Sequence, residues 1–149
     1  MKLVHQACIN VFIKEGENAE KIEETLTKLV PLNLEKEKIT INKQSAAGLE
    51  DKKIMIEEII LTKQKHTTEF LKNLLNNLTS EQKELLLSQA ESRLDEHLHF
   101  FIRLDKDKLL NNEFEITDSG NCFHIKLSIA AFPAKREVGL EIINTIFQA

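Results

Sequence analysis

The residues best suited to contact a ligand alternate along two apolar segments in the last third of the chain. The first row is His97, His99, Phe101 and Arg103, and the second is His124, Lys126 and Ser128. Aromatic and imidazole rings stack on nucleobases, and Arg and Lys contact phosphates. If the two segments pair as strands, this face is suited to single-stranded RNA, with Phe101 and His99 stacking. The alternative is an ordinary polar outer face of an antiparallel sheet.

A second candidate lies where a strand is followed by a C-terminal helix. Lys135 and Arg136 fall in the expected first helical turn, after Pro133 as the first helical residue. Two cations there oppose the helix dipole, and a bound phosphate would offset this cost. The alternative is that Glu137 balances them and that both cations are solvated.

The segment Arg103-Leu104-Asp105-Lys106 ends the first of the two alternating segments. Asp105 is placed to cap the turn that follows, which leaves Arg103 and Lys106 to project toward solvent. The predicted phosphate contacts are therefore Arg103, Lys106, Lys135 and Arg136, with Lys126 beside them. The RNA interpretation requires these cations to converge on one patch.

The sequence does not favour a metal site, a catalytic site or a disulfide. His97, His99 and His124 lack an evident thiolate or carboxylate partner for zinc, so we expect no metal and no other cofactor. No nucleophile elbow, phosphate loop or zinc-protease motif is present, so we expect no catalytic residues. Cys8 and Cys122 lie in strand-like segments and are expected to be buried thiols rather than a disulfide.

The hydrophobic pattern predicts an α+β domain, a mostly antiparallel sheet with helices packed on one face. Helical spacing marks residues 22–30, 70–78 and 86–94, with a capping box from Thr79 to Gln82 between the last two. A short helical turn is expected at 105–110 and a helix at 133–147. Strands are expected at 3–14, 39–41, 54–61, 97–104, 114–116 and 122–132, with a polar turn from Ser45 to Lys53 around Gly48.

The length and net charge of the chain exclude some classes of protein. The 149 residues suit one domain, 1–149, and the net charge of -4 excludes a globally basic nucleic-acid binder while leaving room for a local basic face. No apolar run has the length of a membrane span, and the first residues lack a signal-peptide core. We therefore expect a cytoplasmic protein with no membrane contact.

Two segments resemble a known family. Residues 100–106 read F-F-I-R-L-D-K and residues 130–137 read A-A-F-P-A-K-R-E. Both resemble, in order and spacing, the hallmarks of an archaeal family first described as a domain of unknown function. That family was later described as an RNA-binding domain of predicted exosome subunits. The resemblance is specific in the last third and architectural before it.

The resemblance implies a fold like that of the large-subunit ribosomal protein that binds 5S rRNA. It also implies RNA binding, association with the exosome, and recurrent polar positions at Arg103, Asp105, Lys106, Lys135 and Arg136. Ribosome-associated proteins are a further expected class of partner for an RNA-binding module. The first hypothesis is thus a non-enzymatic RNA-binding module. The alternative is a protein-interaction adaptor without direct RNA binding, which the acidic charge balance favours.

Overall fold

The computed structural model describes residues 2–47 and 52–148, which form an α+β fold around one five-stranded antiparallel sheet. The strands are β1 (Val4–Lys14), β2 (Ile41–Ala47), β3 (Lys53–Leu61), β4 (His99–Asp105) and β5 (Cys122–Ile129). The helices are α1 (Ala19–Leu29), α2 (Gln64–Asn77), α3 (Ser80–Ser88), α4 (Ala90–Arg93), α5 (Lys106–Leu110) and α6 (Arg136–Phe147). The predicted fold class is confirmed.

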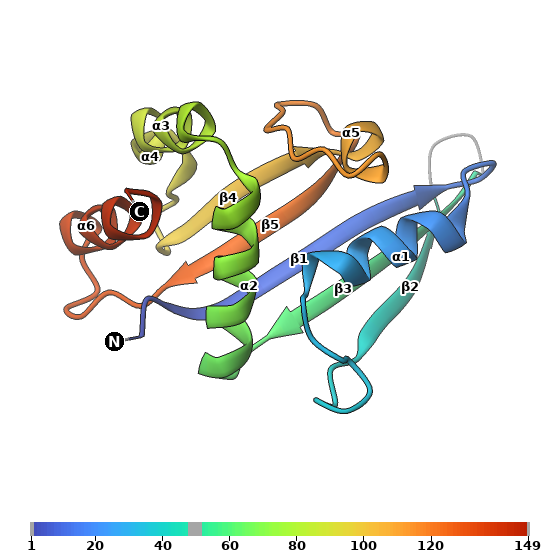
Figure 1. Cartoon of the computed structure of the whole chain (residues 1–149), viewed down its shortest axis with the longest axis horizontal. Coiled ribbons are helices and arrows are strands. Elements are labelled where there is room, and N and C mark those ends of the chain that lie inside the picture. Colours follow the sequence, from blue (N-terminus) through green and yellow to red (C-terminus); the bar gives the residue numbers. More distant parts are fainter. Residues whose placement is uncertain (1, 48–51, 149) are drawn as a thin grey trace.

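The strand order is β2-β3-β1-β5-β4, so β1 lies at the centre of the sheet. Figure 1 shows α1 and α2 lying across the near face of the sheet, with α3, α4 and α6 gathered beside the start of β4. The hydrophobic core fills the space between this face and the helices. Ile9 of β1, Ile125 of β5 and Phe70 of α2 have no exposed surface there. Each such side chain stabilises the fold by about 1.5–3 kcal/mol.

The far face of the sheet carries the alternate side chains, and they are partly exposed. Phe12 of β1 is 49% exposed and Ile60 of β3 is 40% exposed. We call this surface the open face. Its existence follows from the period of two in each strand, because every second residue must point away from the helices.

The helical hairpin between β3 and β4 agrees with the prediction at its turn. The Thr79 hydroxyl accepts a hydrogen bond from the Gln82 amide at 3.1 Å, and the Gln82 side chain accepts one from the Thr79 amide at 2.8 Å. The predicted second helix is divided, because Gln89 leaves the helical conformation between α3 and α4.

Four predicted boundaries are wrong. Residues 114–116 form no strand, since only Ile116 bridges to Leu104. The last strand stops at Ile129, and α6 begins at Arg136 because Lys135 is still extended. Pro133 therefore lies in the corner before the helix. Strand β2 runs past Ser45, and Gly48 of the predicted turn lies outside the described residues.

Two smaller observations complete the fold. Cys8 and Cys122 are free, buried thiols, as predicted. Among the described residues, no helix has the length and apolar character needed to cross a membrane.

Candidate nucleic-acid interface

Strands β4 and β5 bring the two alternating rows together on the open face. They pair antiparallel, with Phe101 opposite Lys126, Arg103 opposite His124 and His99 opposite Ser128. The side-by-side pairing on which the sequence interpretation depended is therefore present. We call this set of six residues the β4–β5 platform.

The rings of the platform form a continuous row. The His99 and Phe101 rings meet edge to face with their centroids 6.4 Å apart, and the Phe101 and His124 rings lie 5.5 Å apart with a tilt of 36°. His97 extends the row beyond His99, at 6.3 Å. Such a row offers successive π-faces on which unstacked bases can lie.

Two cations flank these rings. The exposed Arg103 uses one guanidinium nitrogen to donate to the Asp118 carbonyl at 3.0 Å, which orients the group and leaves other donors for a ligand. Lys126 is half-buried opposite Phe101. None of the six platform residues is acidic, and Asp95 lies beside His99 at its far end, so Arg103 and Lys126 make the charge of the platform itself positive. Burial, then the nearby Arg103 and Lys126, lower the pKa of His124, which keeps its ring neutral at pH 7.

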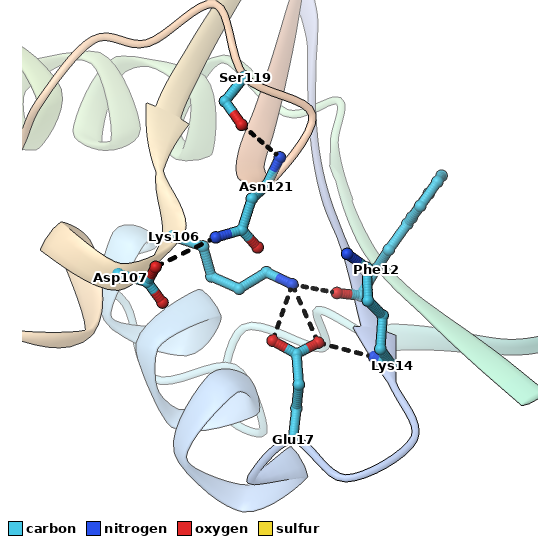
Figure 2. Close-up of polar contacts among 7 residues, drawn as sticks. All are labelled: Phe12, Lys14, Glu17, Lys106, Asp107, Ser119 and Asn121. Carbon is cyan, nitrogen blue, oxygen red and sulfur yellow. Dashed lines mark hydrogen bonds and ion pairs between the residues drawn. The ribbon is translucent and has the colours of Figure 1, made fainter.

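Lys106 does not project, and that prediction is wrong. Its side chain is buried, at 1% exposure, and its ammonium donates to the backbone carbonyl of Phe12 at 2.7 Å and to Glu17 Oε1 at 3.2 Å. Figure 2 shows the Lys106 side chain reaching toward the end of β1. The burial of Lys106 could have been predicted from its spacing to Leu109. The two residues are three positions apart and share the buried face of α5.

Asp105 caps α5 as predicted, because its side chain accepts a hydrogen bond from the Lys108 amide at 2.9 Å. Of the four residues from Arg103 to Lys106, only Arg103 is therefore exposed. Leu104 is fully buried in the core. The segment is thus mainly structural, and its single projecting cation belongs to the β4–β5 platform.

Lys135 and Arg136 lie away from this platform. They follow the last residue of β5, whereas Arg103 pairs near its first residue, roughly 15–20 Å back along the strand. The Arg136 guanidinium donates to the carbonyls of Leu94, at 2.9 Å, and Glu91, at the end of α4. The predicted cations therefore do not converge on one patch, so the RNA interpretation is wrong in the form that required Lys106, Lys135 and Arg136 beside Arg103. Arg103 and Lys126 are the two that share a face with Phe101.

Two aromatic residues were missed by sequence reasoning. Phe12 follows the alternation of β1, and its ring is about half exposed on the open face. Phe132, in the corner before α6, is 95% exposed. A single exposed Phe is common on protein surfaces, so Phe12 carries weight only because it adjoins other exposed apolar residues of the open face.

The histidines form no metal centre within residues 2–47 and 52–148. No group of three or more His, Cys, Asp or Glu side chains there is placed to hold an ion. His97 and His99 instead lie near carboxylates, with His99 Nδ1 3.4 Å from Asp95.

Comparison with known proteins finds relatives that match over nearly the whole chain. The RNA-binding protein PAB1135 of Pyrococcus abyssi is 27% identical over 140 residues, which cover 94% of this chain and 91% of that protein. The crystal structure of protein AF2318 from Archaeoglobus fulgidus, a DUF54 protein, is 30% identical with a TM-score of 0.85. The match covers 96% of this chain and 99% of that one.

A second solved structure is similar along nearly its whole length. Mth689, a DUF54 protein from Methanothermobacter thermautotrophicus, is 28% identical with a TM-score of 0.79, covering 97% of this chain and 98% of that one. A family model described as RNA binding matches residues 6–130. That range contains all five strands from Gln6 onward and the whole β4–β5 platform. The chain belongs to this RNA-binding family.

Proposed function

We propose that this protein binds single-stranded RNA on the β4–β5 platform. The observation that carries the proposal is the ring row of His99, Phe101 and His124, flanked on an open sheet face by Arg103 and Lys126. Membership of an RNA-binding family supports the same ligand. Helices cover the other face of the sheet, so the open face is the side on which a strand of RNA can lie flat.

Phosphate contacts and base stacking affect RNA affinity in different ways. Phosphate contacts by Arg103 and Lys126 release counterions, so affinity falls as salt rises, by a slope of about 0.7 for each contact with a single strand. Stacking on Phe101 contributes about 1–3 kcal/mol for a base and is tolerant of sequence. We therefore propose a binder with a preference for unpaired RNA and little sequence discrimination along this row.

A titration of a fluorescent single-stranded RNA decamer across a range of salt tests the proposal. Lys126→Ala should lower the salt slope by about 0.7, and Phe101→Ala should weaken binding about tenfold without changing the slope. Lys72→Ala is the matched control, because Lys72 is an exposed lysine of α2, on the covered side of the sheet. Loss of affinity in Lys72→Ala equal to that in Lys126→Ala would contradict the proposal.

Protein docking is the competing function, and one observation favours it. The β1–β3 half of the open face carries an apolar group, with Phe12 and Ile60 exposed and Ile54 and Ile56 partly so, beside the polar pair Asn10 and Glu58. Exposed apolar patches are typical of interaction surfaces. A partner that stays bound after nuclease treatment, together with no RNA binding by the purified protein, would select this function instead.

We further propose that residues 1–149 act as one domain without catalytic activity. Association with the exosome stays a prediction of the resemblance. Association with ribosome-linked proteins and a cytoplasmic location stay predictions of the sequence. Copurification of tagged protein with exosome or ribosomal subunits, before and after nuclease treatment, tests the association.

A further inference from the structure

A hollow of about 370 Å³ opens on the open face at the Arg103 end of the β4–β5 platform. Phe12 and Ile56 supply apolar walls from β1 and β3, and Cys122 lies between them and β4. Asn10, Arg103 and His124 add polar groups around these walls. The volume is at the lower end of the range for small-molecule sites, which suits one flat ring system rather than a folded partner.

Hydrogen bonds from α5 fix the backbone that forms the walls of this hollow. The Lys106 ammonium fixes the backbone of Phe12 by its hydrogen bond to the carbonyl, while the Phe12 ring points away from Lys106 (Figure 2). The Lys106 amide donates to the Asn121 carbonyl at 3.1 Å. The Asn121 side chain donates to Asp107 at 3.2 Å, so the loop that brings Gly120 to the rim is tied to α5. A site held in this way loses little freedom when a ligand enters.

The chemistry of the lining selects the kind of ligand. Among the described residues no carboxylate lines the hollow, and Arg103 and His124 belong both to its lining and to the β4–β5 platform. An RNA strand whose phosphates contact Arg103 would thus place a neighbouring nucleotide at its mouth. Phe12 offers a ring for stacking, and the Asn10 amide, which also contacts the Cys8 thiol, keeps its carbonyl oxygen and a donor hydrogen for a base edge.

We propose that this hollow receives one unstacked nucleobase of the bound RNA, packed on Phe12 and contacted at its edge by Asn10. The inference rests on the proposed function and adds to it a single position where base identity is read. Along the remainder of the platform, the rings stack on bases without reading their edges.

Mononucleotides separate this inference from RNA binding in general. The four nucleoside 5′-monophosphates are titrated into isotopically labelled protein, and the Asn10 side-chain amide and Gly120 backbone amide resonances are followed. Ribose 5-phosphate is the matched ligand without a base. At least one nucleotide should shift both resonances saturably, whereas ribose 5-phosphate, which can contact only Arg103 at the rim, should leave the Asn10 resonance in place. Phe12→Ser should weaken that binding about tenfold.

Ile60→Ser is the control variant, because Ile60 is an exposed apolar residue of the same face that does not line the hollow. It should bind mononucleotides as the wild-type protein does, and matching unfolding midpoints would establish that both variants are folded. Equal shifts with ribose 5-phosphate, or undiminished binding by Phe12→Ser, would overturn the inference.

An RNA decamer titrated in parallel distinguishes failure of the base site from failure of the proposed RNA binding. Decamer binding without mononucleotide shifts at Asn10 and Gly120 would overturn the hollow as a base site and leave the proposed function standing. No decamer binding would overturn the proposed function and this inference with it.

Discussion

The ammonium of Lys106 donates a 2.7 Å hydrogen bond to the backbone carbonyl of Phe12, which lies 94 positions earlier in the chain. Glu17 holds the same ammonium from the loop after β1 and also accepts a hydrogen bond from the Lys14 amide at 2.8 Å. One buried cation therefore joins the start of α5 to the end of β1. Because Phe12 lies on the open face, this contact also shapes the surface that we propose for RNA.

Removing Glu17 should lower the stability of the fold more than removing Lys106. Glu17→Ala leaves a buried ammonium with one carbonyl partner and should lower the free energy of unfolding by about 3 kcal/mol. Lys106→Met keeps much of the volume and leaves Glu17, whose side chain is 29% exposed, able to reach water. Its cost should be smaller, about 1–2 kcal/mol. Urea unfolding of both variants measures the difference, and an equal or reversed order would contradict the account.

The buried Glu57, which lies beside the partly exposed Glu23 and the exposed Lys43, predicts a pH dependence of folding stability. Burial, then the neighbouring Glu23 carboxylate, raise the pKa of Glu57 to about 7, while an ion pair with Lys43 at 2.6 Å keeps Glu23 ionised. Between about pH 4.5 and pH 7 the folded chain retains a proton that the unfolded chain has released. The contribution of Glu57 to stability must therefore fall as the pH rises through this window.

Glu57→Gln removes this titration. The difference in free energy of unfolding between the variant and the wild-type protein should shift in favour of the variant as the pH rises from 4.5 to 8. The shift should be on the order of 1–3 kcal/mol. Urea unfolding at both pH values measures the change. Glu84→Gln, at an exposed position of α3, is the control and should show the wild-type dependence. A Glu57→Gln variant with the same pH dependence as the wild-type protein would exclude this role for Glu57.

Arg136 predicts a stability effect at the corner before α6. Its guanidinium satisfies the carbonyls of Leu94 and Glu91, which terminate α4 and have no helical partner. Arg136→Ala should lower the free energy of unfolding by about 1–2 kcal/mol. Lys135→Ala, at the exposed neighbouring position, should leave it within about 0.5 kcal/mol of the wild-type value. Comparable unfolding midpoints for the two variants would show that Arg136 has no such structural role.

The parts of the fold that depend on short periods were predictable from the sequence. Alternation from His97 to Leu104 and from Cys122 to Ile129 predicted which side chains share the open face, because the side-chain period of a strand is two. The capping box at Thr79 and the cap at Asp105 were also predictable, because each is decided within four residues.

The parts that depend on contacts between distant segments were not predictable. Lys106 is buried because Glu17 and the Phe12 carbonyl are present to receive it, and no local pattern reveals partners about 90 positions away. The hollow beside Phe12 has walls from four strands and one loop, so it exists only once the strand order β3-β1-β5-β4 is known. The start of α6 was misplaced because Pro133 is acceptable both in a turn and at a helix start.

The measurement that tests the central claim most directly is a map of amide resonances on addition of a single-stranded RNA decamer. The account predicts the largest shifts on the open face, at Phe101, Arg103 and Lys126 of the β4–β5 platform and at Phe12 of β1. Residues of α1 and α2, on the covered side of the sheet, should shift little. Shifts concentrated on those helices or at the start of α6, with the platform unchanged, would contradict it.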